Sequence, residues 1–202
     1  MNKIRSICVY CGSSAGLRPE YLQAAVVLGT ALGQSGIRLV YGGGTHGIMG
    51  AVAHATIQAG GQALGIIPHF LMNKEASEGA LKGLSELIVT KDMHERKHAL
   101  FENSDAFVAL PGGIGTVEEI VEVMTWAQLG RHTKPIVFAN IAGFWNPMLQ
   151  LIDHMKAEGF IHTANLVNPL VVDYAVDIVP TILRRWQNLT PDLGSKETLD
   201  RL

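Results

Sequence analysis

Two glycine-rich segments have the residue types and spacing of loops that bind phosphate groups. Residues 42–47 (GGGTHG) spell G-x-G-x-x-G, and residues 111–116 (PGGIGT) form a second loop; each lies between a predicted strand and a predicted helix. Glycine lets the backbone turn with positive φ, and the N–H groups at the start of a helix attract anions. Both segments therefore predict phosphate binding, with a tight turn that packs strand against helix as the alternative.

The first loop lacks the acidic residue that a dinucleotide site usually needs. Dinucleotide-binding proteins place this residue at the end of the following strand, where it binds the adenosine ribose. Here that strand ends in Ile67-Pro68-His69. A mononucleotide is therefore favoured over NAD or FAD, and no cofactor is expected.

Two glutamates, Glu118 and Glu119, directly follow the second loop. A carboxylate repels a phosphate, so a glutamate at this place indicates another task, such as facing the sugar of a nucleotide. Thr116 and Glu119 also fit the T-x-x-E capping box, in which the glutamate only binds a backbone N–H at the start of a helix. The spacing leaves both interpretations open.

The segment 94–98 (HERKH) matches the zinc-binding motif H-E-x-x-H. Arg96 and Lys97 would place two positive charges beside the metal ion, so no metal site is predicted. The same two cations could bind a phosphate, Arg96 through its planar guanidinium. A solvated basic turn is the alternative.

Cys8 and Cys11 are the two cysteines of the chain and have the spacing of a redox C-x-x-C motif. Redox motifs place the reactive thiol at a helix N-terminus, whereas this pair begins inside a predicted strand. We therefore predict buried thiols. Their low number agrees with a reducing, cytoplasmic compartment.

Three segments, taken in order, resemble the LONELY GUY (LOG) family: 42–50 (GGGTHGIMG), 93–97 (MHERK) and 111–119 (PGGIGTVEE). The resemblance covers about residues 4–186. Members of this family are cytokinin riboside 5′-monophosphate phosphoribohydrolases, often mislabelled as lysine decarboxylases. The resemblance implies hydrolysis of the N-glycosidic bond of N6-modified adenosine 5′-monophosphates, which releases the free base and ribose 5-phosphate. It also implies a homodimer with the site near the subunit boundary.

The resemblance implies specific site residues as well. Glu119 matches the active-site carboxylate, and Arg96 matches the second essential residue. A further family glutamate corresponds to Glu75, with Glu78 as the alternative because this chain is slightly longer there. The other substrate-binding residues that we predict are Gly43, Gly44, Met49, Lys97, Gly112, Gly113, Ile114, Gly115, Thr116, Val117, Glu118 and Thr125.

Three other activities compete with this interpretation. A plain AMP nucleosidase would use the same chemistry, with water replacing the base through an oxocarbenium-like transition state. A non-catalytic nucleotide-binding protein would keep both glycine loops but would not need Glu119 and Arg96 together. Lysine decarboxylation would need a Schiff-base lysine for pyridoxal phosphate, and nothing around the lysines indicates one.

The elements that must position these residues alternate between strand and helix. Several predicted strands are continuous apolar runs, which is typical of a parallel sheet covered on both faces. We predict a doubly wound, Rossmann-like α/β domain over residues 1–188 and a flexible tail at 189–202. The predicted strands are 4–10, 37–41, 63–68, 84–90, 106–110 and 135–139; the predicted helices are 19–34, 47–59, 92–103, 116–129, 146–158 and 174–186.

The composition excludes several classes of protein. The 202 residues include 16 Lys and Arg against 18 Asp and Glu, so the chain lacks the basic footprint that nucleic acid or an anionic membrane demands. With 48% hydrophobic residues it has enough apolar material for a sizeable core. It shows neither an apolar run of membrane-helix length nor a signal-peptide pattern. The expected partner is a small-molecule nucleoside monophosphate.

Overall fold

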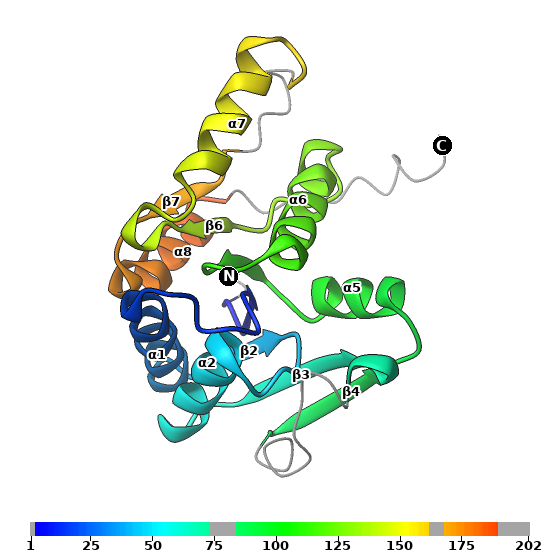
Figure 1. Cartoon of the computed structure of the whole chain (residues 1–202), viewed down its shortest axis with the longest axis vertical. Helices are drawn as coiled ribbons and strands as arrows, with labels where there is room; N and C mark the ends of the chain where they lie inside the picture. The colour runs from blue at the N-terminus through cyan, green and yellow to red at the C-terminus, as the bar shows by residue number, and fades with distance from the viewer. Residues whose placement is uncertain (1–2, 73–83, 162–167, 190–202) are drawn as a thin grey trace.

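The strands in the described part of the protein form one parallel sheet. The computed structural model describes residues 3–72, 84–161 and 168–189. In this part of the chain seven strands lie in the order β4-β3-β2-β1-β5-β6-β7, and every neighbouring pair is parallel (Figure 1). The strands are β1 (Ser6–Tyr10), β2 (Arg38–Tyr41), β3 (Ala63–Pro68), β4 (Glu86–Thr90), β5 (Ala106–Ala109), β6 (Ile136–Ala139) and β7 (Leu170–Val172).

Helices cover both faces of this sheet (Figure 1). One core cluster joins the sheet to α1 (Pro19–Gln34), α2 (Gly47–Gln58) and α8 (Ile178–Gln187). A second cluster, on the other face, joins it to α5 (Met93–Glu102), α6 (Ile114–Gln128) and α7 (Asn146–Ala157). The predicted doubly wound α/β fold is therefore confirmed. Short 3₁₀ turns are η1 (His69–Leu71), η2 (Ile141–Gly143) and η4 (Ala175–Asp177).

The central strand β1 sends alternate side chains to the two cores, as the pleat requires. Cys8 belongs to the cluster under α5 and α6, whereas Cys11 belongs to the cluster under α1 and α2. Both thiols are free and buried, and burial raises the pKa of each. The prediction of buried cysteines is therefore confirmed. Thiols on opposite faces of a sheet also cannot serve as a redox pair.

Some predicted boundaries are wrong, and one strand was not predicted. The helix expected at 174–186 is the turn η4 followed by α8, and α6 begins two residues before the predicted start at Thr116. The strand β7 has three residues, too few for a hydrophobic period to be recognised. Within the described ranges, no helix combines the length and apolar character needed to cross a membrane.

Three loops interlock at the carboxyl edge of the sheet. Gly12 follows β1 and donates its N–H to the carbonyl of Pro111, 3.1 Å away. A Cβ at Gly12 would lie 3.3 Å from the Cα of Gly112, and a Cβ at Gly47 would collide with the backbone of Ser13. Glycine at these positions lets the loops after β1, β2 and β5 pack backbone against backbone.

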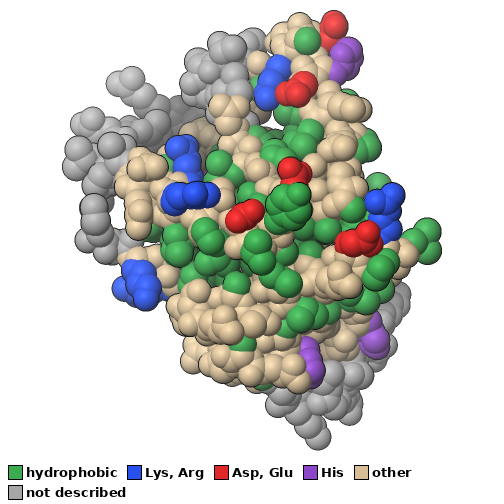
Figure 2. Space-filling model, turned by 90° about the vertical axis from the view of Figure 1, so that its left-hand side faces the viewer, with side chains coloured by type: hydrophobic (Ala, Val, Ile, Leu, Met, Phe, Trp, Pro, Cys, Tyr) green, Lys and Arg blue, Asp and Glu red, His purple; other side chains and the backbone are tan. Residues whose placement is uncertain are grey.

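The side of the molecule formed by α1 and η4 exposes apolar side chains. Figure 2 shows hydrophobic side chains on this side lying among acidic ones. Exposed apolar residues of these elements include Val26 on α1 and, around η4, Tyr174 and Val176. This surface is called the α1/η4 face below.

Candidate active site

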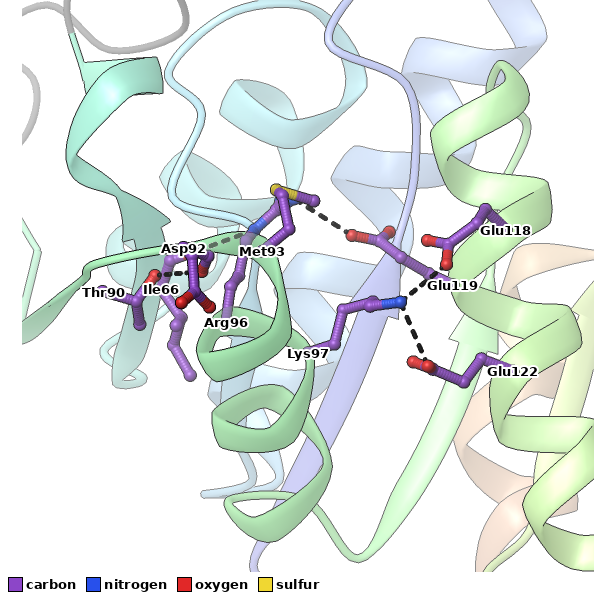
Figure 3. Close-up of polar contacts among 9 residues, drawn as sticks. All are labelled: Ile66, Thr90, Asp92, Met93, Arg96, Lys97, Glu118, Glu119 and Glu122. Atoms are coloured by element: carbon purple, nitrogen blue, oxygen red, sulfur yellow. Dashed lines mark hydrogen bonds and ion pairs between the residues drawn. The ribbon is translucent and has the colours of Figure 1, made fainter.

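A buried ion pair joins α5 to α6 at the carboxyl edge of the sheet (Figure 3). Nη1 of Arg96 lies 3.2 Å from Oε1 of Glu119, and the two side chains are only 7% and 10% exposed. Removing two charges from water is costly, and the cost is offset only when the charges are paired and hydrogen-bonded. The two residues that the sequence singled out for catalysis are therefore brought into direct contact.

The Arg96 guanidinium is held by backbone as well as by Glu119. Its Nε donates to the carbonyl oxygen of Ile66 in β3 at 3.2 Å. Its Nη2 lies against the backbone of Gly42, where an added Cβ would collide with it. The first glycine of the first loop therefore makes room for the arginine.

Glu119 is not part of a capping box. The helix α6 begins at Ile114 with Gly113 as its N-cap, so Thr116 lies inside the first turn and caps nothing. Glu119 lies in the second turn and is buried with its carboxylate on Arg96. The capping interpretation is therefore wrong, because the helix starts earlier than the T-x-x-E spacing suggested.

The first turn of α6 presents backbone N–H groups to solvent. Gly113, Ile114 and Gly115 are exposed, Ile114 by 85%. Among the described residues no carbonyl or side chain accepts from the N–H groups of Ile114 and Gly115, as expected for the start of a helix. A Cβ at Gly113 or Gly115 would meet nothing within 4 Å. Packing does not require these two glycines, and the space above them is open.

The interior of the same turn is closely packed. Thr116 is buried, and its hydroxyl lies where a Cβ of Gly112 would be. Val117 is partly buried and packs on the core under α5 and α6. Gly112 and Thr116 therefore shape the loop rather than line its open side.

The first glycine loop differs from the second in its backbone hydrogen bonds. The N–H groups of Ile48 and Met49, at the start of α2, donate to the carbonyls of Ser14 and Gly12 at 3.4 and 3.2 Å. The loop after β1 thus takes the place at α2 that a phosphate would take. Of the two predicted phosphate loops, the second has the more accessible N–H groups.

The other first-loop positions in the predicted set support the turn itself. Gly43 and Gly44 are buried, and Gly43 has a φ of 74°, in the left-handed region that favours glycine. The sulfur of Met49 lies 3.4 Å from the position of a Cβ on Gly42, next to the Arg96 guanidinium. Met49 therefore lies beside the arginine, whereas Gly43 and Gly44 belong to the buried part of the turn.

Lys97 and Glu118 contact each other rather than an open site. The Lys97 ammonium lies 2.7 Å from Glu118 and 3.0 Å from Glu122, one helical turn further along α6 (Figure 3). Hydrogen bonds to Glu118 and Glu122 raise the pKa of Lys97. Glu122 was not predicted as a site residue, although its i, i+4 spacing from Glu118 places both on one side of a helix.

The H-E-x-x-H segment lies at the start of α5 and has a capping role. Glu95 accepts from the N–H of Lys91 at 2.9 Å, and its own N–H donates to Asp92, the N-cap residue. These two bonds resemble a D-x-x-E capping box, except that the N–H bound by Glu95 belongs to Lys91, the residue before the N-cap. His94 and His98 are exposed. No group of three or more metal-ligating side chains occurs in the described part of the chain.

Thr125, Glu75 and Glu78 complete the predicted set. Thr125 is on the exposed side of α6, where its hydroxyl donates to the carbonyl of Val121. It follows Glu119 by six residues, about 9 Å along the helix axis, and so lies apart from the ion pair within one chain. Glu75 and Glu78 fall outside the described residues.

A buried tryptophan supports the strand that leads into the second loop. The indole N–H of Trp145 donates to the carbonyl of Ala109, the last residue of β5, at 3.0 Å. The backbone N–H of Trp145 is in turn bound by the side chain of Asn140. This contact helps to fix where the strand ends and the glycine loop begins.

Solved structures share this fold. A molybdenum cofactor carrier protein from Chlamydomonas reinhardtii superposes with a TM-score of 0.66 at 21% identity, covering 93% of this chain and all of that one. A molybdenum cofactor binding protein from Rippkaea orientalis gives 0.64 at 19% identity, covering 90% and 97%. At such low identity the likeness concerns the fold alone.

Sequence relatives are much closer. A family model described as "Possible lysine decarboxylase" matches residues 49–182. Cytokinin riboside 5′-monophosphate phosphoribohydrolase LOG of rice (Oryza sativa subsp. japonica) is 48% identical over 160 residues, 79% of this chain but 65% of the rice protein. LOG1 of Arabidopsis thaliana is 47% identical over 160 residues, which is 79% of this chain and 74% of LOG1. The chain therefore belongs to the LONELY GUY (LOG) family.

Proposed function

We propose that this protein hydrolyses the N-glycosidic bond of adenosine 5′-monophosphates, N6-modified ones in particular, to release the free base and ribose 5-phosphate. The observation that carries the proposal is the buried Arg96–Glu119 pair beside the open first turn of α6. The rice and Arabidopsis relatives are cytokinin riboside 5′-monophosphate phosphoribohydrolases, which supports it. We propose residues 1–188 as the catalytic domain and 189–202 as a flexible C-terminal tail.

The open turn of α6 suits the 5′-phosphate. Its N–H groups and the positive end of the helix dipole attract an anion, and glycine at 113 and 115 leaves the backbone bare. A phosphate bound there would anchor the nucleotide one to two helical turns from Glu119. Gly112, Thr116 and Val117 then shape and support this turn.

We assign Glu119 the role of acting on the reacting sugar. As the C1′–N bond breaks, positive charge develops on the ribose, and a nearby carboxylate stabilises it or orients the attacking water. Water supplies the hydroxyl on C1′ and a proton to the departing base. Arg96, held by Ile66 and Gly42, keeps the carboxylate in place and offers its remaining donors to the nucleotide.

The name of the family model does not lead us to a decarboxylase. A pyridoxal phosphate enzyme needs a lysine amine to form a Schiff base with the cofactor. Lys97 adjoins Arg96 but is held as an ammonium between two glutamates. The carboxylate and guanidinium of the site suit glycoside hydrolysis instead.

The decisive experiment offers the purified full chain three compounds: N6-isopentenyladenosine 5′-monophosphate, the corresponding riboside and AMP. Free base and ribose 5-phosphate are followed by chromatography. We expect release from the monophosphates but not from the riboside, which lacks the anchoring phosphate. The ratio of rates on the two monophosphates separates a cytokinin-releasing enzyme from a plain AMP nucleosidase. Nucleotides that bind without releasing base would contradict the proposal and leave a nucleotide-binding protein.

We also propose a homodimer whose site lies near the subunit boundary. Ile114, Val121 and Leu129 are exposed along one side of α6, the side that also carries Thr125. Pairing through this side would cover the apolar side chains and bring Thr125 of one subunit toward the site of the other.

Light scattering tests this arrangement. Val121→Glu places a charge in the proposed interface and should shift the protein to monomers. The matched control Val176→Glu alters the α1/η4 face and should leave the dimer intact. A monomeric wild-type protein, or dissociation by the control alone, would contradict the α6 interface.

The proposed location is the cytoplasm. Cys8 and Cys11 are both unpaired and buried, which agrees with a compartment that keeps thiols reduced.

A further inference from the structure

Three ion pairs connect α5 and α6, and they differ in burial. Arg96 and Lys97 follow each other on α5, as Glu118 and Glu119 do on α6. Because consecutive residues of a helix point about 100° apart, Arg96 faces the sheet whereas Lys97 faces α6. The inner pair, Arg96–Glu119, is buried, and the outer cluster, Lys97 with Glu118 and Glu122, lies nearer the surface.

The outer cluster lies close to the proposed phosphate site. Glu118 is five residues into α6, about one turn from the exposed N–H groups of Ile114 and Gly115. A carboxylate at this distance repels a phosphate dianion. Glu122 adds a second negative charge on the same side of the helix. The Lys97 ammonium, in contact with both, offsets this repulsion.

Lys97 is poorly suited to bind the substrate itself. An ammonium has three donors, and two of them are engaged by Glu118 and Glu122 at 2.7 and 3.0 Å. The side chain is 15% exposed. Releasing it toward a ligand would leave two glutamates without their cation beside an anion.

We propose that Lys97 is a positioning residue: it ties α5 to α6 so that Arg96 meets Glu119, and it offsets the charge of Glu118 and Glu122 so that the first turn of α6 accepts a phosphate. This inference rests on the proposed function. It replaces the expectation that Lys97 contacts the nucleotide.

The test compares three variants of the full chain: Lys97→Met, Lys97→Arg and the triple variant Lys97→Met/Glu118→Gln/Glu122→Gln. We measure kcat and KM for the monophosphate and the inhibition constants of ribose 5-phosphate and adenine. In Lys97→Met, KM and the ribose 5-phosphate constant should rise about tenfold, the effect of one unscreened nearby charge. The adenine constant should change less than about twofold, because a neutral base feels little of that charge.

The other two variants identify the cause. Lys97→Arg keeps the charge and both contacts, so its KM should stay near the wild-type value. The triple variant should recover most of the lost affinity, because it removes the carboxylates that Lys97 offsets. A triple variant as weak as Lys97→Met would overturn the inference and make Lys97 a direct substrate contact. Equal weakening of adenine and ribose 5-phosphate would overturn its electrostatic part.

A second measurement keeps this inference separate from the proposed function. If the wild-type protein releases no base, the proposed function fails on its own. The coupling between Lys97→Met and Glu118→Gln in urea unfolding then tests the tie between the helices. We expect a measurable coupling, and additive effects would overturn the positioning role.

Discussion

At the scale of single residues, burying the charges of the Arg96–Glu119 pair costs free energy of folding. Buried ion pairs can often be replaced by apolar residues of similar volume without loss of stability. The two side chains are 7% and 10% exposed and lie at the edge where parallel sheets bind ligands. A role in catalysis therefore explains this pair better than a role in stability does. The variant that separates these roles changes charge but not shape.

Glu119→Gln is that variant. We expect kcat to fall by about 1000-fold or more, because the amide cannot stabilise a positive ribose as a carboxylate does. The free energy of unfolding should fall by about 1–3 kcal/mol, since Arg96 loses its charged partner but keeps its bond to Ile66. Single-turnover assays and urea unfolding give the two numbers. Glu158→Gln, on an exposed residue, is the matched control and should change neither.

These two side chains could be predicted from the sequence, but the backbone groups that hold them could not. Arg96 and Glu119 were found through motif spelling and family resemblance. The carbonyl of Ile66 and the close approach of Gly42 depend on which strands become neighbours. No residue type signals a carbonyl, so these partners become visible only when the order of strands in the sheet is known.

At the scale of elements, hydrophobic periodicity predicted most of the fold. The helix at 19–34 and the strand at 63–68 were predicted with the bounds of α1 and β3. The start of α6 was missed because Thr116 resembled a cap, whereas the true N-cap is Gly113, which makes no side-chain cap bond. A short sequence motif can predict the wrong helix start in this way when backbone conformation decides where the helix begins.

Gly115→Ala tests what the open start of α6 is for. Alanine favours a helix over glycine by up to about 1 kcal/mol, and its methyl group meets nothing in the protein. The free energy of unfolding should therefore stay the same or rise. KM for the monophosphate should nevertheless rise by about tenfold, because the methyl occupies space that the phosphate needs.

Adenine inhibition serves as the internal control for this variant. Its inhibition constant should be unchanged, because the base is not the group bound at this turn. An unaltered KM would indicate that the phosphate binds elsewhere.

At the scale of the whole molecule, stability should depend on the protonation of one buried histidine. His132 is 9% exposed, and its ring nitrogens contact the carbonyl of Val123 at 2.9 Å and the N–H of Lys134 at 3.1 Å. The ring nitrogen that accepts from Lys134 must be unprotonated. Burial, together with the nearby Lys134 ammonium, lowers the pKa of His132 below its ordinary value of 6.5.

The sign of the effect follows from this lowered pKa. As the pH falls below 6.5, the unfolded chain takes up a proton at His132 before the folded chain does, so the free energy of unfolding decreases. At neutral pH the contribution of His132 to the free energy of unfolding is fully present. Urea unfolding gives the free energy of unfolding at about pH 7.5 and at about pH 5.5. Its decrease between these two pH values should be smaller for His132→Gln than for the wild type. Equal losses in both proteins would remove His132 as the cause.

The two glycine loops, alike in spelling, should differ in how their amide hydrogens exchange with solvent. The N–H groups of Ile48 and Met49 are engaged by Ser14 and Gly12, so their exchange should be slow with or without ligand. Those of Ile114 and Gly115 are exposed at the start of α6 and should exchange rapidly until a nucleotide arrives. Deuterium uptake would then report occupancy of this site from one short peptide, with the corresponding peptide of α2 as its built-in reference.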